Sequence, residues 1–196
     1  MKSITNRSKD KILSNIREAN KKRVDLPILE GLGVDFDDKI AHFADMLASV
    51  GGELIDSSED IGTVVERLYP DVKKIATTEI GLIEGAIDPN KLEDSHLLDG
   101  IELAIVKAEF GVAENGAVWV QNPLDRHKAL YFIAKHILFI LDREKIVSSM
   151  HEAYKMIEFN DSRFGVFISG PSKTADIEQS LVIGAHGAIS SRVLLV

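Results

Sequence analysis

Two short and almost uninterrupted apolar runs constrain the fold of this chain more than any other feature. Residues 101–107 read Ile-Glu-Leu-Ala-Ile-Val-Lys, and residues 136–141 read His-Ile-Leu-Phe-Ile-Leu. Runs of this length are too short to cross a bilayer, but they suit strands that are covered on both faces. Strands of this kind are typical of a parallel sheet flanked by helices.

The rest of the sequence alternates between helical apolar spacing and further short strands. We expect helices over residues 38–50, 60–69 and 143–159, and strands over residues 54–55, 72–77, 110–114, 117–121, 164–169 and 192–196. Residues 81–100 and 126–133 are predicted to be loops with short helices. Three strands follow one another between residues 101 and 121 without a helix between them, which indicates an antiparallel insertion or edge. The predicted class is therefore α/β, with a mixed, largely parallel sheet flanked by helices.

Length and charge bound the domain organisation and the partners. The 196 residues suit one α/β domain over residues 26–196, preceded by a helical extension over residues 1–25. The formal net charge of −8 argues against sequence-independent binding to nucleic acid or an anionic membrane, because both need a positive surface. The polar N-terminus lacks the apolar core of a signal peptide, so we expect a cytoplasmic protein. The oligomeric state, a homo-oligomer included, is left open.

The chain contains no cysteine. Disulfides, thiolate ligation of zinc or an iron–sulfur cluster, and a cysteine nucleophile are therefore excluded. The six histidines show no H-x-x-x-H spacing, so we predict no metal and no cofactor within the chain.

The first candidate site follows the strand predicted over residues 164–169, at the turn Gly170-Pro171-Ser172-Lys173-Thr174. We expect a short helix over residues 174–181 that Ser172 caps, with the backbone N–H groups of Lys173 and Thr174 at its start. Together with the Lys173 charge, this turn would bind a phosphate or a carboxylate, and Asp176 in the first helical turn would temper the site. The alternative is an ordinary capped helix start.

Two other turns carry side chains capable of chemistry. His186 lies between Gly184 and Gly187, where it could act as a general acid/base or contact an anion, or be purely structural. Glu114 precedes Asn115-Gly116 between two predicted strands and could be a reactive carboxylate. However, Asn-Gly is also a strong hairpin signal, and in that reading Glu114 simply flanks the turn.

Extended through Asp176, the Gly170 turn carries a longer pattern. The stretch Gly-Pro-Ser-Lys-Thr-Ala-Asp-Ile-Glu over residues 170–178, followed by Leu-Val-Ile-Gly-Ala-His-Gly over residues 181–187, resembles the C-terminal signature of the LUD domain family. Within that family the chain looks like the LutC/YkgG-type lactate utilisation proteins. The Ala-Glu-Asn-Gly turn at residues 113–116 lies where the family shows an Ala-Glu-Thr-Gly-like turn. Two residues depart from the pattern: Asn115 replaces the commoner threonine, and Ala188 stands where a proline often follows.

The resemblance implies a fold similar to the NagB/RpiA/CoA-transferase group and a role in oxidising L-lactate to pyruvate. It also implies partner proteins that carry iron–sulfur clusters, a division of labour that agrees with the absence of cysteine here. The chain is then a non-catalytic subunit that binds a small anionic ligand, with Asn115, Gly116, Gly170, Ser172, Lys173, Thr174, Asp176, Gly184 and Gly187 as candidate binding residues.

The alternative is an enzyme similar to the CoA-transferases or the folate cyclo-ligases. In this reading Glu114 is the reactive carboxylate, faces the pocket around Ser172 and His186, and is the catalytic residue together with His186. A purely structural subunit is the third reading.

Overall fold

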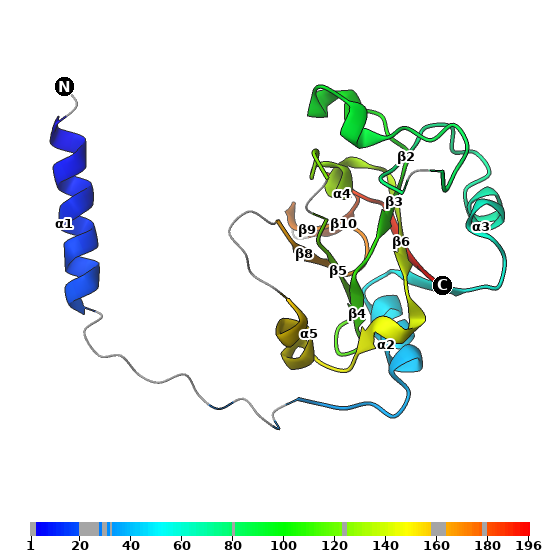
Figure 1. Cartoon of the computed structure of the whole chain (residues 1–196), viewed down its shortest axis with the longest axis horizontal. Helices are drawn as coiled ribbons and strands as arrows, with labels where there is room; N and C mark the ends of the chain where they lie inside the picture. The colour runs from blue at the N-terminus through cyan, green and yellow to red at the C-terminus, as the bar shows by residue number, and fades with distance from the viewer. Residues whose placement is uncertain are drawn as a thin grey trace. The chain divides into compact units, whose positions relative to one another are not determined.

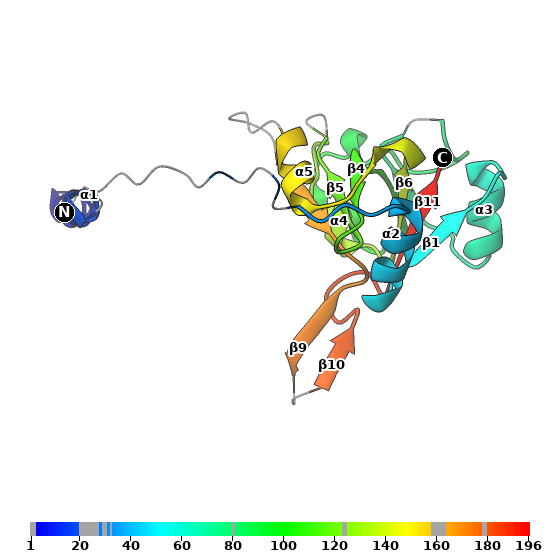
Figure 2. The same cartoon turned by 90° about the horizontal axis from the view of Figure 1, so that it is seen from below.

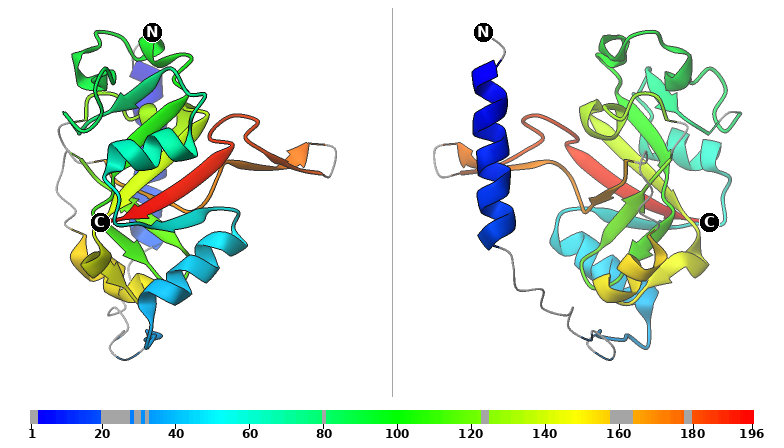
Figure 3. Two further views of the ribbon diagram at one scale, coloured as in Figure 1. Left: turned by 90° about the vertical axis from the view of Figure 1, so that its right-hand side faces the viewer. Right: turned by 60° about the vertical axis from the view of Figure 1, so that its left-hand side comes forward.

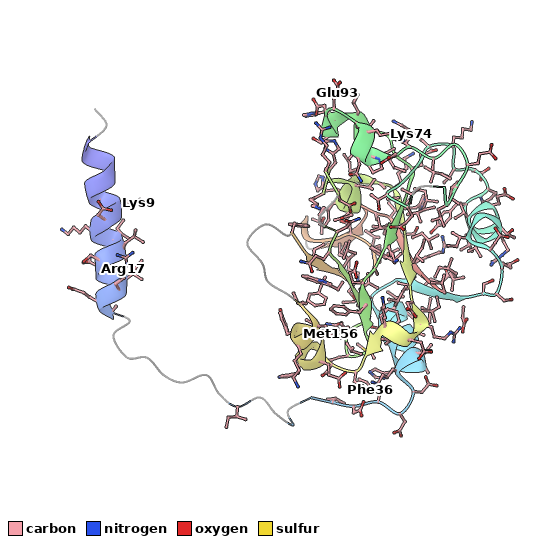
Figure 4. All side chains as sticks on the ribbon, viewed as in Figure 1. Lys9, Arg17, Phe36, Lys74, Glu93 and Met156 are labelled. Carbon is pink, nitrogen blue, oxygen red and sulfur yellow. The ribbon has the colours of Figure 1, made fainter. Side chains whose placement is uncertain are left out.

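The computed structural model describes residues 3–19, 28, 31, 33–79, 81–122, 125–157, 164–177 and 180–196. It divides into two compact units, Met1–Gly31 and Leu32–Val196. The first unit contains α1 (Ser3–Ala19), which includes Lys9 and Arg17 (Figure 4) and exposes its apolar side chains Ile12 and Ile16. Residues 20–25 of the predicted extension lie outside the described residues, and the boundary at residue 25 stays a proposal.

A parallel sheet is the frame of the second unit. Its strand order is β1 (Glu53–Asp56), β11 (Ser190–Leu195), β6 (His136–Leu141), β3 (Leu103–Lys107) and β2 (Ile75–Thr77), and every neighbouring pair is parallel. The two apolar runs that constrain the sequence most form β3 and β6, which lie side by side in this sheet. The predicted α/β class with a largely parallel sheet is confirmed.

A second sheet holds the strands expected as an insertion. Its order is β7 (Ile146–Val147), β4 (Phe110–Val112), β5 (Ala117–Val120) and β8 (Val166–Ile168). The β4–β5 and β5–β8 pairs are antiparallel, and the β4–β7 pair is parallel. The insertion strands β4 and β5 therefore belong to a second sheet that they form together with β7 and β8.

The two sheets and the helices pack in layers (Figure 1). One face of the parallel sheet, which includes Ile105 and Leu138, packs on α3 (Ile61–Leu68). The opposite face, which includes Phe139, packs on α2 (Lys39–Ser49), on α4 (Leu130–Ile133) and on the inner face of the second sheet. The outer face of the second sheet, including Trp119, packs on α5 (Met150–Met156).

Gly111 allows the second sheet to approach this core closely. A Cβ at this position would lie 2.9 Å from Leu141 Cδ2 and 3.2 Å from Phe43 Cε2. A larger side chain at position 111 would force the Leu141 and Phe43 side chains to move.

Several connections between the strands contain short 3-10 helices whose first turns are capped by aspartate side chains. The excursion between β2 and β3 contains the 3-10 helices η1 (Pro89–Lys91) and η2 (Ser95–Leu98). Asp38 and Asp60 accept hydrogen bonds from the first turns of α2 and α3, as expected of aspartate at an N-cap. Within the described ranges, no helix combines the length and the apolar content that crossing a membrane requires.

The single helix predicted over residues 143–159 is wrong. The segment forms the 3-10 helix η3 (Arg143–Lys145), then β7, and only then α5. Ile146 and Val147 pair with β4 instead of continuing a helix, because β-branched residues fit a strand that completes a sheet. Ser149 caps α5, and Tyr154 in this helix is 55% exposed.

The short helix predicted over residues 174–181 is also wrong. The chain forms an antiparallel hairpin of β9 (Lys173–Ile177) and β10 (Ser180–Ile183), which is a separate two-stranded sheet. Figures 2 and 3 show this hairpin extending away from the two larger sheets of its unit.

Candidate functional site

The two turns with the family resemblance meet at the C-terminal end of α2. Gly116 has a φ of +64°, and a Cβ there would lie 2.5 Å from the backbone nitrogen of Leu47. Gly170 has a φ of +71°, and a Cβ there would lie 2.6 Å from the carbonyl oxygen of Val50. Both positions combine a left-handed backbone with a close approach to another backbone, so both require glycine.

A hydrogen bond joins the two turns directly. The Ser169 hydroxyl donates to the carbonyl oxygen of Asn115 over 2.8 Å. The Asn115 side chain closes its own turn, since its Oδ1 accepts from the N–H of Ala117 at 3.1 Å.

The turn that contains His186 packs on the Gly170 turn from the other side. The N–H of Ser172 donates to the carbonyl of Ala188, and the N–H of Gly184 donates to the carbonyl of Ser172, both over 2.8 Å. A Cβ on Gly187 would lie 2.9 Å from the Ser172 Cβ and 3.1 Å from the Phe132 carbonyl oxygen. Glycine at this position therefore lets the two turns touch.

A cavity of about 290 Å³ lies between these turns and the helix α4. Its polar side chains are Ser169, Ser172 and His186, of which His186 is exposed to solvent. The remaining lining consists of Tyr131 and of residues that are apolar or glycine: Phe132, Ile137, Phe167, Ile168, Gly170, Pro171, Gly187 and Ala188. Such a site suits a ligand with one polar and one apolar end.

Tyr131 is fixed in the cavity wall by a buried carboxylate. Its hydroxyl donates a short hydrogen bond to Asp125 Oδ2, and Tyr131 and Asp125 are 3% and 6% exposed. Burial, followed by the bond to Asp125, raises the pKa of the Tyr131 phenol, which is therefore neutral at physiological pH. In the described part of the chain, Asp125 Oδ1 has no hydrogen-bond partner.

Four of the candidate residues line this cavity: Gly170, Ser172, His186 and Gly187. Lys173, Thr174 and Gly184 belong to the hairpin or its end and do not line the cavity. Asp176 lies in β9, but its side chain and Glu178 fall outside the described residues. Because a hairpin replaces the predicted helix, no helix N-terminus contributes to anion binding at this turn.

Glu114 is turned away from the cavity. Its Oε2 accepts a hydrogen bond from the N–H of Met150 at 2.7 Å, and its own N–H donates to the Ser148 carbonyl at 3.0 Å. Its exposed carboxylate thus holds the first residue of α5, and the expectation that Glu114 faces the pocket around Ser172 and His186 is wrong.

The aromatic wall of the cavity, formed by Tyr131, Phe132 and Phe167, was not predicted from the sequence. The available signal is the Tyr-Phe pair that lies just before the buried strand at residue 136. No set of three or more side chains able to hold a metal ion occurs in the described ranges.

Comparison with known proteins places the chain among related sequences. Residues 9–196 match the LUD domain family. Lactate utilization protein C of Bacillus pumilus is 27% identical over 134 residues, which are 65% of this chain and 56% of that protein. YkgG of Escherichia coli is 31% identical over 117 residues, which are 56% of this chain and 50% of that protein. The chain spans about half the length of the curated relatives it matches.

A solved structure shares the fold. The crystal structure of a DUF162 family protein from Deinococcus radiodurans superposes with a TM-score of 0.59 at 13% identity. The match covers 80% of this chain and 95% of that chain.

Proposed function

Because the chain belongs to the LUD domain family, we propose that it is a component of a system that oxidises L-lactate to pyruvate. In this proposal the chain binds a small anionic ligand in the cavity beside Gly170 and is not the electron carrier. The observation that carries the proposal is the pair of backbone hydrogen bonds that Ser172 makes with Ala188 and Gly184. These bonds join the Gly170 turn to the turn that contains His186, and both turns line one cavity.

The donors of the cavity suit a carboxylate. The Ser169 hydroxyl already donates to Asn115, so Ser172 and His186 are the side chains that donate to a bound anion. The aromatic rings of Phe132 and Phe167 would cover the apolar end of the ligand. The volume lies near the lower end of the range for ligand pockets, about 300–1,000 Å³.

The proposed partners are proteins that carry iron–sulfur clusters. This chain has no cysteine to hold such a cluster, so the electrons from lactate would pass to clusters on other chains. Exposed apolar side chains at the cavity support a contact with a partner, since Phe132 lines the cavity and is 46% exposed, and Ile189 beside Ala188 is 50% exposed.

An enzyme that uses Glu114 as a reactive carboxylate finds no support in the position of that residue. The Glu114 carboxylate accepts the Met150 N–H and does not line the cavity.

Affinity capture from cells grown on L-lactate tests the proposal. The tagged full chain is expected to co-purify with proteins that contain iron and acid-labile sulfide and whose clusters L-lactate reduces, as read by electron paramagnetic resonance. Phe132→Asp should weaken the capture, whereas Leu97→Asp, at a 54% exposed position that does not line the cavity, should not. Captured material without iron would contradict the proposal.

A further inference from the structure

The hairpin of β9 and β10 stands apart from the two larger sheets of its unit. Within the described ranges its strands pair only with each other, and Figures 2 and 3 show them extending away from the larger sheets. Each strand therefore has one open edge. An isolated two-stranded hairpin is only marginally stable in water, whereas three or more strands can be stable. An added strand would thus stabilise this hairpin.

A hydrogen bond at the base of the hairpin shows which backbone groups point outward. The N–H of Gly184 donates to the carbonyl of Ser172 over 2.8 Å. The next pair along the ladder is Ile183 with Lys173. Since bonded and non-bonded pairs alternate in an antiparallel ladder, the N–H and C=O groups of Ile183 point away from β9. The same alternation places the backbone groups of Leu181 on this outer edge of β10.

The two open edges of the hairpin differ in the residues that they carry. β9 begins at the exposed Lys173 and contains Asp176, and charged residues on an edge strand oppose pairing with a further strand. β10 reads Ser-Leu-Val-Ile without any charge, and its Ile183 side chain is 49% exposed. The outer edge of β10 is therefore the edge that is suited to take another strand.

We propose that the outer edge of β10 pairs with the same edge of a second copy of this chain, antiparallel about a two-fold axis at Val182. The two hairpins then form one four-stranded sheet. In this register Leu181 lies opposite Ile183 of the second copy, and each such pair exchanges both of its N–H···O=C bonds. The interface lies outside the cavity and does not depend on the proposed function.

The composition of β10 favours a second copy over an unrelated strand. An uncharged strand that pairs with itself brings no like charges together, and the β-branched Val182 then lies opposite Val182 of the second copy. A two-fold arrangement also closes the open β10 edges of both hairpins at the same time. In Figure 2 the hairpin extends away from the larger sheets, and none of their strands pairs with β10 in the part of the chain that the structure describes.

Sedimentation velocity of the full chain over a series of concentrations tests this interface. The mass should rise from 21.6 kDa toward twice that value as the concentration increases. Ile183→Pro removes an outward N–H that the hairpin itself does not use. It should move the midpoint of dimer formation to a concentration about tenfold higher or more, because each dimer loses two hydrogen bonds. Lys173→Pro removes the equivalent outward N–H on the β9 edge and should leave the midpoint unchanged.

Ile183→Lys keeps the backbone groups and places a charge on the edge of both copies, so it should also prevent the dimer. The matched variant Leu97→Lys, at a 54% exposed position outside the hairpin, should form the dimer as the unchanged protein does. A dimer that persists in both Ile183 variants would overturn the proposal, because another surface would then hold the two copies together. A single mass of 21.6 kDa even at millimolar concentration would overturn it as well.

Amide hydrogen exchange of the full chain gives a readout that needs no substitution. The N–H groups of Leu181 and Ile183 should exchange slowly in the dimer, and their protection should increase with protein concentration. The N–H of Val182 faces β9 and should be protected to a similar degree at every concentration. Exchange of the Leu181 and Ile183 amides that does not depend on concentration would contradict pairing at this edge.

Discussion

Replacing Gly170 by alanine tests whether the signature turn is held against the end of α2. Alanine in a left-handed backbone costs roughly 1–2 kcal/mol, and the φ here is +71°. The new Cβ would also lie 2.6 Å from the Val50 carbonyl oxygen, and overpacking of this kind costs a further ~1–3 kcal/mol. The free energy of unfolding should therefore fall by about 3 kcal/mol, which corresponds to a melting temperature lower by about 6–12 °C in a domain of this size.

Urea and thermal unfolding of Gly170→Ala should be compared with Gly85→Ala. Gly85 has a φ of +75°, but in the described part of the chain nothing lies within 4 Å of its Cβ position. The control should thus lose only the backbone contribution, about 1–2 kcal/mol. Equal losses for the two variants would refute the claim that contact with α2 fixes the turn.

Three further substitutions follow from individual contacts. Glu114→Ala removes the acceptor of the Met150 N–H and should lower the free energy of unfolding by about 1 kcal/mol. Glu114→Gln keeps an acceptor oxygen and should lose less stability. Equal losses of the two variants in urea titrations would contradict this role of Glu114. Tyr131→Phe leaves the buried Asp125 carboxylate without its donor and should cost about 1–3 kcal/mol, and a neutral result would show that this bond does not stabilise the fold. Because burial lowers the pKa of His136, the unfolded chain binds more protons, so the free energy of unfolding should fall as the pH drops from about 6.5 toward the pKa of the folded state. His136→Gln should flatten that part of the pH profile, and an unchanged slope would contradict it.

The central sheet was predictable because its strands are nearly pure apolar runs. A strand that is buried on both faces needs apolar residues at nearly every position, whichever strands it pairs with. The predicted bounds of β3 and β6 therefore agree with the structure to within two residues. The N-caps Asp38 and Asp60 also depend on local sequence, because each capping side chain bonds to its own helix.

The hairpin after Gly170 was not predictable from local pattern. Ser172 with Asp176 four residues later resembles a helix start. In the structure, however, the Ser172 N–H donates to the Ala188 carbonyl, and the Ser172 carbonyl accepts from the Gly184 N–H. These tertiary hydrogen bonds override a local capping preference. The start of α5 was missed despite a usable signal, since Ser149 and Glu152 have the spacing of a capping box.

The candidate site was predictable in part. The glycines at 170 and 187 and the polar residues Ser172 and His186 do line one cavity. The direction of the Glu114 side chain could not be read from sequence, because it depends on where α5 begins.

Calorimetric titration of the full chain with L-lactate tests the central claim most directly. The proposed function predicts saturable binding of one lactate in the cavity, competition by pyruvate, and a loss of affinity in His186→Ala of about tenfold or more. The matched variant His96→Ala, at an exposed histidine outside the cavity, should bind as the unchanged protein does. Equal lactate affinity in His186→Ala and the unchanged chain, or no binding at millimolar lactate, would contradict the claim.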